Sequence, residues 1–215
     1  MISKRSLFDA VMVSALLAST LAANAKPITF VIGDDKKRDL VSFTSDAPVE
    51  LIVGNTHAID GSVTLDDSLD LKKQPLQAVF NVDLAQIDTG IPLRNEHMRD
   101  NFLETKKYPK ATFILKTVQS ATVLKPGVKT KLIANGDFTL HGKTVKKTIP
   151  VYVTYFKKCP MTEQKMPGCH LLQVNAQFPV AFVKDHGVQR PEIVFQKLAD
   201  TVEVKVAATA FVKAK

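Results

Sequence analysis

Most of this chain alternates apolar and polar residues with a period of two, the spacing that places successive side chains on opposite faces of a β-strand. The pattern is clearest at residues 134–141 and 201–208. Shorter alternating runs lie at 28–32, 41–45, 61–65, 78–84, 113–115, 149–155 and 172–178. These runs predict successive short antiparallel strands, each with one apolar and one polar face.

About eight such strands favour a single curved sheet that closes on itself, because closure leaves no unpaired strand edge. We therefore predict an all-β fold, an antiparallel eight-stranded barrel with room inside for one small ligand. Its inward positions include six phenylalanines: Phe30, Phe43, Phe80, Phe113, Phe138 and Phe178. These rings either fill the barrel or line an apolar channel, and the pattern fits both interpretations.

The stretch from Ile87 to Phe113 interrupts the alternation. Asp88-Thr89-Gly90 consists of turn residues, and Pro92 prevents the sheet from continuing. From Leu93 to about Leu103 the residues suit a short helix, which in a barrel covers an open end or lines an entrance. The same three turn residues match the short signature of aspartic proteases, but no second copy exists in the chain, so we predict a turn.

The first 25 residues have the composition of a secretory leader. Lys4 and Arg5 precede an apolar run at 10–21, and Ala23-Asn24-Ala25 resembles a cleavage site. The run is shorter than the roughly 20 apolar residues that cross a bilayer. We expect cleavage after Ala25 and export, which leaves 190 residues, 26–215, as one domain.

The formal net charge is +8 for the whole chain, and +7 once the leader, which holds Lys4, Arg5 and Asp9, is removed. Lysines scattered along strands and loops are typical of a solvated surface with protected strand edges. A sharper interpretation is attraction to an anionic ligand or an anionic membrane surface. Export and the lack of a recognition motif argue against nucleic acid as a partner.

Two cysteines, Cys159 and Cys169, lie ten positions apart. In an oxidising compartment they predict one disulfide that closes a short loop. Together with Met161, Met166 and His170 they also form a set of soft ligands that would suit copper. The spacing fits neither covalent haem attachment nor structural zinc, so we prefer the disulfide and keep copper as the alternative.

The sequence has no G-x-S-x-G elbow, no H-E-x-x-H motif and no glycine-rich phosphate loop, so we predict a protein that is not an enzyme and has no catalytic residues, metal or cofactor. His97 is the most suggestive ionisable residue, because an imidazole can ligate a metal or bind a polar headgroup. It can equally tie the helix to the barrel rim. Arg94 and Arg99 can pair with an anionic headgroup or with acidic residues of the same segment.

Four motifs, in order, resemble the YceI family of periplasmic, lipocalin-like polyisoprenoid-binding proteins. They are D-T-G, R-x-E-H-M-R, Y-P-x-A-T-F and G-D-F-T-L-H-G-K-T, at Asp88–Gly90, Arg94–Arg99, Tyr108–Phe113 and Gly136–Thr144. The family's closing pattern is similar to Phe182–Gly187 and Leu198–Val206. The resemblance covers nearly the whole chain after the leader, but the cysteine loop is not a general feature of the family.

The resemblance implies a lipocalin-like barrel whose long apolar pocket holds an isoprenoid chain, such as a polyprenyl lipid or a quinone. The inward residues that would contact this lipid are Phe43, Phe80, Val82, Phe113, Leu115, Phe138, Leu140, Val153 and Phe178. Arg94, His97 and Arg99 would lie at the mouth and contact the headgroup. The leading hypothesis is therefore a lipid carrier; the alternative is a redox or copper-handling protein that uses the loop from Cys159 to His170. Transient membrane contact and a dimeric state stay open.

Overall fold

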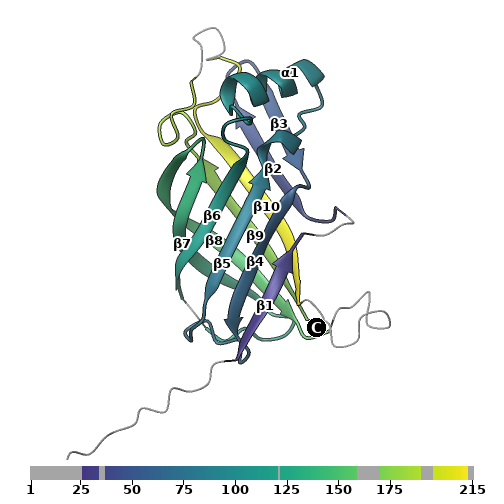
Figure 1. Cartoon of the computed structure of the whole chain (residues 1–215), viewed down its shortest axis with the longest axis vertical. Coiled ribbons are helices and arrows are strands. Elements are labelled where there is room, and N and C mark those ends of the chain that lie inside the picture. The colour runs from purple at the N-terminus through teal and green to yellow at the C-terminus, as the bar shows by residue number, and fades with distance from the viewer. Residues whose placement is uncertain (1–25, 34–36, 121, 159–169, 190–195, 213–215) are drawn as a thin grey trace, which may run out of the picture.

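The computed structural model describes residues 26–33, 37–120, 122–158, 170–189 and 196–212. The strands in these ranges are β1 (Pro27–Ile32), β2 (Leu40–Asp46), β3 (Leu51–Thr56), β4 (Ile59–Asp66), β5 (Gln77–Asp83), β6 (Lys110–Gln119), β7 (Lys129–Leu140), β8 (Lys143–Phe156), β9 (Leu171–Val180) and β10 (Val202–Val212). The helical segments are the 3-10 turn η1 (Leu84–Gln86), the helix α1 (Pro92–His97) and the π-helical turn η2 (Met98–Phe102). Figure 1 shows the helical segments together above one end of a tall barrel.

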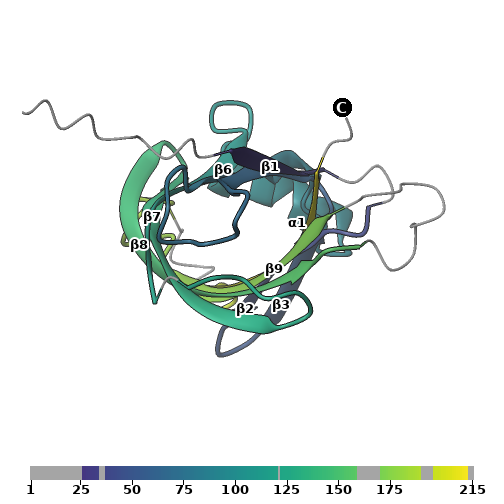
Figure 2. The same cartoon turned by 90° about the horizontal axis from the view of Figure 1, so that it is seen from below.

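Eight antiparallel strands close the barrel, in the order β1-β4-β5-β6-β7-β8-β9-β10. Closure is made where β10 pairs with β1, with Phe30 opposite Val212 and Val31 opposite Phe211. Seen from below, the strands form a ring around a central space (Figure 2). The predicted fold, an eight-stranded antiparallel barrel with a short helical insertion near its mouth, is confirmed.

The hairpin of β2 and β3 extends the wall beside the upper part of β10. β2 pairs with residues 203–207 of β10, on the edge that β1 occupies lower down. The other edge of the hairpin meets the chain after β5, where Asn55 and Asp88 exchange two backbone hydrogen bonds of 2.9 and 2.8 Å. The upper wall is therefore completed by the hairpin and the residues that lead into α1.

Strand β7 shows how the alternating sequence produces the barrel. Leu132, Ala134, Gly136, Phe138 and Leu140 are buried on the inner face, whereas the residues between them are half-buried. At the end of β7 the chain reverses through His141-Gly142, with φ of 50° and 72°. Two successive residues with positive φ are typical of the tight turn that matches strand twist, so the predicted turn is confirmed.

The helical insertion starts at Pro92, the first residue of α1, where proline is favoured because its fixed φ suits a helix and no backbone N–H is needed. α1 passes into η2 and ends at Phe102, close to the predicted end near Leu103. Asp88-Thr89-Gly90 forms a turn, in which the Asp88 carboxylate accepts a hydrogen bond of 2.8 Å from the Gly90 N–H and Gly90 has φ of 78°. The predicted turn is confirmed.

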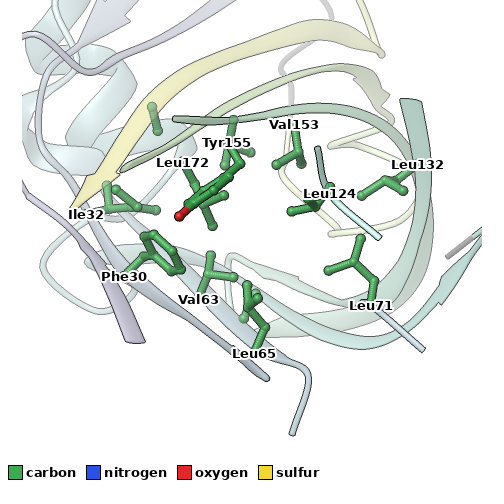
Figure 3. Close-up of a cluster of buried hydrophobic side chains, with 14 of the residues drawn as sticks. Phe30, Ile32, Val63, Leu65, Leu71, Leu124, Leu132, Val153, Tyr155 and Leu172 are labelled. Atoms are coloured by element: carbon green, nitrogen blue, oxygen red, sulfur yellow. The ribbon is translucent and has the colours of Figure 1, made fainter. Parts of the chain in front are cut away.

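The end of the barrel opposite the helices is closed by two loop segments, 67–76 and 122–128. They hydrogen bond to each other, with the Leu124 N–H 2.9 Å from the Leu69 carbonyl oxygen. Each loop also buries one leucine, Leu71 and Leu124, which are 6% and 3% exposed. Figure 3 shows these two leucines with Leu65, Leu132 and Val153 in a cluster of apolar side chains. This cluster forms the floor of the barrel.

Candidate functional site

A cavity of about 610 Å³ runs inside the barrel from the floor to the helical insertion. Leu71 and Leu124 line its closed end, and Ile91 and Leu93 line its other end. Ile91 and Leu93 are also exposed on the molecular surface. Since the same side chains face both the cavity and solvent, the cavity opens at the end that carries α1.

All nine residues that the sequence assigned to lipid contact line this cavity: Phe43, Phe80, Val82, Phe113, Leu115, Phe138, Leu140, Val153 and Phe178. Several of them, such as Phe80 and Phe113, point inward but stay partly exposed. A side chain that points into a barrel keeps solvent exposure only where the interior is not filled. These phenylalanines therefore line a channel, whereas Phe30, which is 0% exposed and packs edge-to-face on Tyr155, fills the barrel near the floor. Their contact with lipid stays a prediction.

The phenylalanines form an aromatic belt because strand pairing places them at one level. Phe80 of β5 is opposite Phe113 of β6, and Phe113 is opposite Phe138 of β7. The ring of Phe138 then meets that of Phe178 edge-to-face, with centroids 6.0 Å apart. On the hairpin, the ring of Phe43 lies across Gly54, where a Cβ atom would collide with it. This close approach explains why glycine occupies the facing position in β3.

The predicted arginine at the mouth, Arg94, is held by three hydrogen bonds. Its Nε donates to the Thr89 hydroxyl at 2.9 Å and one terminal nitrogen donates to the Thr89 carbonyl at 2.8 Å. The other terminal nitrogen donates to the Glu50 carboxylate at 2.6 Å. Arg94 lines the cavity from α1 and Glu50 lines it just before β3. The ion pair therefore links the helical insertion to the hairpin across the cavity opening.

A buried asparagine fixes the geometry beneath this ion pair. The Asn95 amide oxygen accepts from the Thr89 N–H at 2.8 Å and from the Thr89 hydroxyl at 2.7 Å. Its amide nitrogen donates to the Asp88 carboxylate at 2.7 Å. Hydrogen bonds to the charged carboxylate from Asn95 and from the Gly90 N–H lower the pKa of Asp88 below its usual range. The Asp88-Thr89-Gly90 motif thus has a structural role at the mouth.

Of the other two residues predicted at the mouth, His97 lines the cavity and Arg99 does not. His97 is exposed and lines the cavity, so its imidazole is placed to meet a ligand. Arg99 is not among the described residues that line the cavity; its guanidinium donates to the Ala85 carbonyl oxygen at 3.4 Å. Lys197, which the sequence did not suggest, is exposed and also lines the mouth. Glu50 and Lys197 belong to segments far from α1 in sequence, and no local pattern marked them.

A second polar cluster connects three loops at the rim. The His141 imidazole contacts the Glu104 carboxylate at 2.6 Å through Nε2 and the His186 carbonyl oxygen at 3.3 Å through Nδ1. The Tyr108 ring packs on that of His141, with centroids 4.5 Å apart. The side chain of His186 is completely buried and its Nδ1 lies 3.2 Å from the Lys143 carbonyl oxygen. These contacts hold the β7–β8 turn against the residues after η2 and after β9.

The predicted disulfide of Cys159 and Cys169, the loop methionines and the leader with its cleavage site lie outside the described residues. His170, the last residue of the proposed copper set, hydrogen bonds through Nδ1 to the Tyr155 hydroxyl at 2.6 Å. Within the ranges that the structure describes, no group of three or more histidine, cysteine or acidic side chains is arranged to hold a metal ion. None of the helices in those ranges is long and apolar enough to cross a membrane.

Known proteins resemble this chain in both sequence and fold. The protein YceI of Escherichia coli O157:H7 is 35% identical over 101 residues, which cover 46% of this chain and 47% of that protein. The structure of Burkholderia cenocepacia BcnA superimposes with a TM-score of 0.61 at 21% identity, over 83% of this chain and 99% of BcnA. A polyisoprenoid binding domain from Saccharophagus degradans, implicated in plant cell wall breakdown, gives a TM-score of 0.63 at 17% identity, over 87% and 100% of the two chains.

Because these two solved structures are only 21% and 17% identical in sequence to this chain, their similarity shows that the fold is shared. The family is established by a model of the YceI-like domain, which matches residues 35–210. This range begins in the segment before β2 and ends in β10, so it includes the helical insertion and nearly all of the barrel wall. It also includes the aromatic belt and the Glu50–Arg94 ion pair. The chain belongs to the YceI family.

Proposed function

We propose that this protein is a periplasmic carrier that holds an isoprenoid-type lipid, a polyprenyl lipid or a quinone, in the barrel cavity. The observation that supports the proposal most strongly is the apolar cavity of about 610 Å³, closed by leucines at one end and open at the other. A cavity of this shape fits a chain that enters tail first. The leader sequence supports the location, and the Saccharophagus degradans domain provides a polyisoprenoid-binding relative in fold.

The binding mechanism is burial of the lipid tail against the aromatic belt and the aliphatic walls. Each CH₂ group that leaves water contributes about 0.8 kcal/mol, so a long tail binds without a catalytic group. At the mouth, Lys197 and His97 face the space where a headgroup would lie. Arg94 is already bonded to Glu50, so it contributes to a headgroup site mainly by holding the rim in place.

The test is mass spectrometry of lipid extracted from protein purified out of the periplasm. Ala134 lines the cavity from β7 and is 6% exposed, so Ala134→Phe would place a ring in the channel. The matched control is Lys131→Phe, which adds the same ring at an exposed position of the same strand. We expect isoprenoid lipid in the wild type and the control, and a severalfold loss in Ala134→Phe. A wild-type protein that never carries such a lipid would refute the proposal.

A further inference from the structure

Five large apolar side chains are exposed around the cavity opening. Val49 lies just before the hairpin strand β3, and Leu51 and Val53 lie in its first half. Ile91 directly precedes α1, and Leu93 is in the first turn of α1. Their exposed fractions range from 48% to 63%. We call these five residues the apolar lips. Solvent-exposed side chains of this kind, gathered at one place, mark interaction sites more often than single exposed apolar residues do.

The two groups of lip residues lie on either side of one contact. Glu50, between Val49 and Leu51, pairs with Arg94, which follows Leu93, at 2.6 Å. Along β3 the alternation of the strand turns Leu51 and Val53 outward, while Ile52 and Gly54 face the cavity. The hairpin therefore presents an apolar outer face next to the exposed residues of the helical insertion.

The lips are continuous with the interior of the barrel. Ile91 and Leu93 line the cavity and are exposed at the same time, so an apolar surface extends from outside the molecule to the channel. The opposite end of the barrel differs. Val123 and Val128 are similarly exposed there, yet neither lines the cavity, which the leucines of the floor close.

The occupant of this surface can be inferred from its size, place and charge. A stable interface between two proteins takes about 20 to 30 residues a side, whereas the lips consist of five. A partner seated on them would also cover the opening through which a tail must pass. Two exposed lysines stand in the same part of the molecule. Lys197 lines the mouth. Lys106 follows η2, has a side chain that is 91% exposed, and makes a solvent-exposed ion pair of 3.6 Å with Asp100, a weak contact that a lipid phosphate can replace. Apolar side chains framed by lysines fit the headgroup region of a membrane with anionic lipids.

We propose that the apolar lips are a docking surface for an anionic phospholipid bilayer, by which the cavity opening is presented to the membrane. The inference rests on the proposed carrier function, because docking has a purpose only if the cavity exchanges lipid. On docking, the lips enter the headgroup region and the lysines meet lipid phosphates. A tail can then move from bilayer to channel along apolar surface, without crossing water.

The test uses the full exported protein and vesicles of phosphatidylethanolamine and phosphatidylglycerol that contain no isoprenoid. Binding is measured by flotation for the wild type, for the double variant Leu51→Ser/Leu93→Ser, and for Val123→Ser/Val128→Ser at the closed end. We expect the lip variant to lose about tenfold or more in vesicle affinity and the control to match the wild type. Equal affinity for all three proteins, or no binding by the wild type, would overturn the proposal.

A second readout does not depend on a loss of binding. The chain contains no tryptophan, so Leu93→Trp introduces a single reporter at the lips, and Val128→Trp a matched reporter at the closed end. Vesicles with brominated acyl chains should quench the first and leave the second unchanged; equal quenching would contradict docking by the lips. If sedimentation shows instead that the double serine variant turns a dimer into a monomer, the lips are a contact between copies and the membrane proposal is wrong.

The experiments can refute the proposed carrier function and the proposed docking surface independently of each other. A protein that carries isoprenoid but ignores vesicles retains the carrier function and refutes the docking surface. A protein that binds vesicles through its lips but never carries isoprenoid refutes the proposed ligand while the docking surface stands.

Discussion

His186 is a histidine with no solvent-exposed surface. Its ring is completely buried, stands edge-to-face on Phe138 at 5.3 Å between centroids, and has Nδ1 3.2 Å from the Lys143 carbonyl oxygen. Because a carbonyl oxygen only accepts, Nδ1 carries the proton when the ring is neutral. Burial lowers the pKa of His186, and the carbonyls of Lys143 and Leu140 oppose this only in part. Among the charged groups nearby, Asp185 favours the protonated ring and Lys147 disfavours it.

This burial predicts a loss of stability in acid. The unfolded chain takes up a proton on His186 near pH 6.5, whereas the folded chain resists protonation until a lower pH. The free energy of unfolding should therefore fall as pH drops below about 6.5, and this contribution should not vary at higher pH. His186→Gln keeps an N–H for the Lys143 carbonyl but does not titrate, so it should be less stable than the wild type by about 1–3 kcal/mol near pH 8 and show a shallower decline in acid.

Urea unfolding at several pH values measures both effects. His97→Gln, at an exposed position of the mouth, is the control and should keep the wild-type pH profile. An unchanged decline in His186→Gln would show that the pH dependence arises elsewhere.

At the scale of elements, the hairpin of β2 and β3 is held to the helical insertion by few contacts. These are the Asn55–Asp88 backbone pair and the Glu50–Arg94 ion pair; a further hydrogen bond of 2.9 Å joins the Val49 N–H to the Gln196 carbonyl oxygen. Elsewhere in the barrel the wall is more strongly paired, since β7 and β8 match residue by residue from Lys129 to Leu140 of β7. Because β2 is paired with β10 over five residues, the β3 edge of the hairpin is the part of the upper wall most easily displaced.

Glu50→Gln should loosen the hairpin while leaving the barrel intact. Arg94 retains its hydrogen bonds to Thr89, and both members of the ion pair are partly exposed, so global stability should fall by less than about 1 kcal/mol. We expect faster hydrogen exchange at the Asn55 amide and unchanged exchange in β7. Asp137→Asn, which removes the Lys116–Asp137 ion pair on the barrel exterior, is the control. Slow exchange at Asn55 in Glu50→Gln would show that the ion pair does not hold the hairpin.

The elements that could be predicted from the sequence are those with local signals. Alternation identified the inner face of β7, and Pro92 with its polar segment marked α1. The contacts that complete the mouth could not be predicted, because Glu50 and Arg94 are 44 positions apart and are brought together by the pairing of β2 with β10. His186 was missed for a similar reason: its burial depends on a loop packing against β7 and β8.

At the scale of the whole molecule, the floor decides how the cavity ends. Whether the phenylalanines filled the barrel or lined a channel was open in the sequence, since both arrangements give the same alternation. In the structure both arrangements occur, at different heights along the barrel axis. Phe30 and Tyr155 pack together and fill the barrel near the floor, whereas the aromatic belt surrounds open space above them. Leu71 and Leu124, which come from loops without a strand pattern, complete the closed end. The depth of the channel therefore depends on two loop residues as well as on the strands.

The last prediction is that Leu124→Ala shifts the bound lipid toward longer chains. The substitution removes three carbon atoms from the closed end, so part of one further five-carbon unit can enter there, and it should cost the empty barrel about 2–5 kcal/mol. A longer lipid that fills the new space should recover part of this loss, and any lipid at a hundred times its dissociation constant adds about 2.7 kcal/mol. Melting of delipidated protein, with and without added lipid, and mass spectrometry of co-purified chains measure the two effects. Val123→Ala, at the exposed neighbour, should change neither. A folded Leu124→Ala protein with wild-type chain lengths would show that Leu124 does not limit the tail.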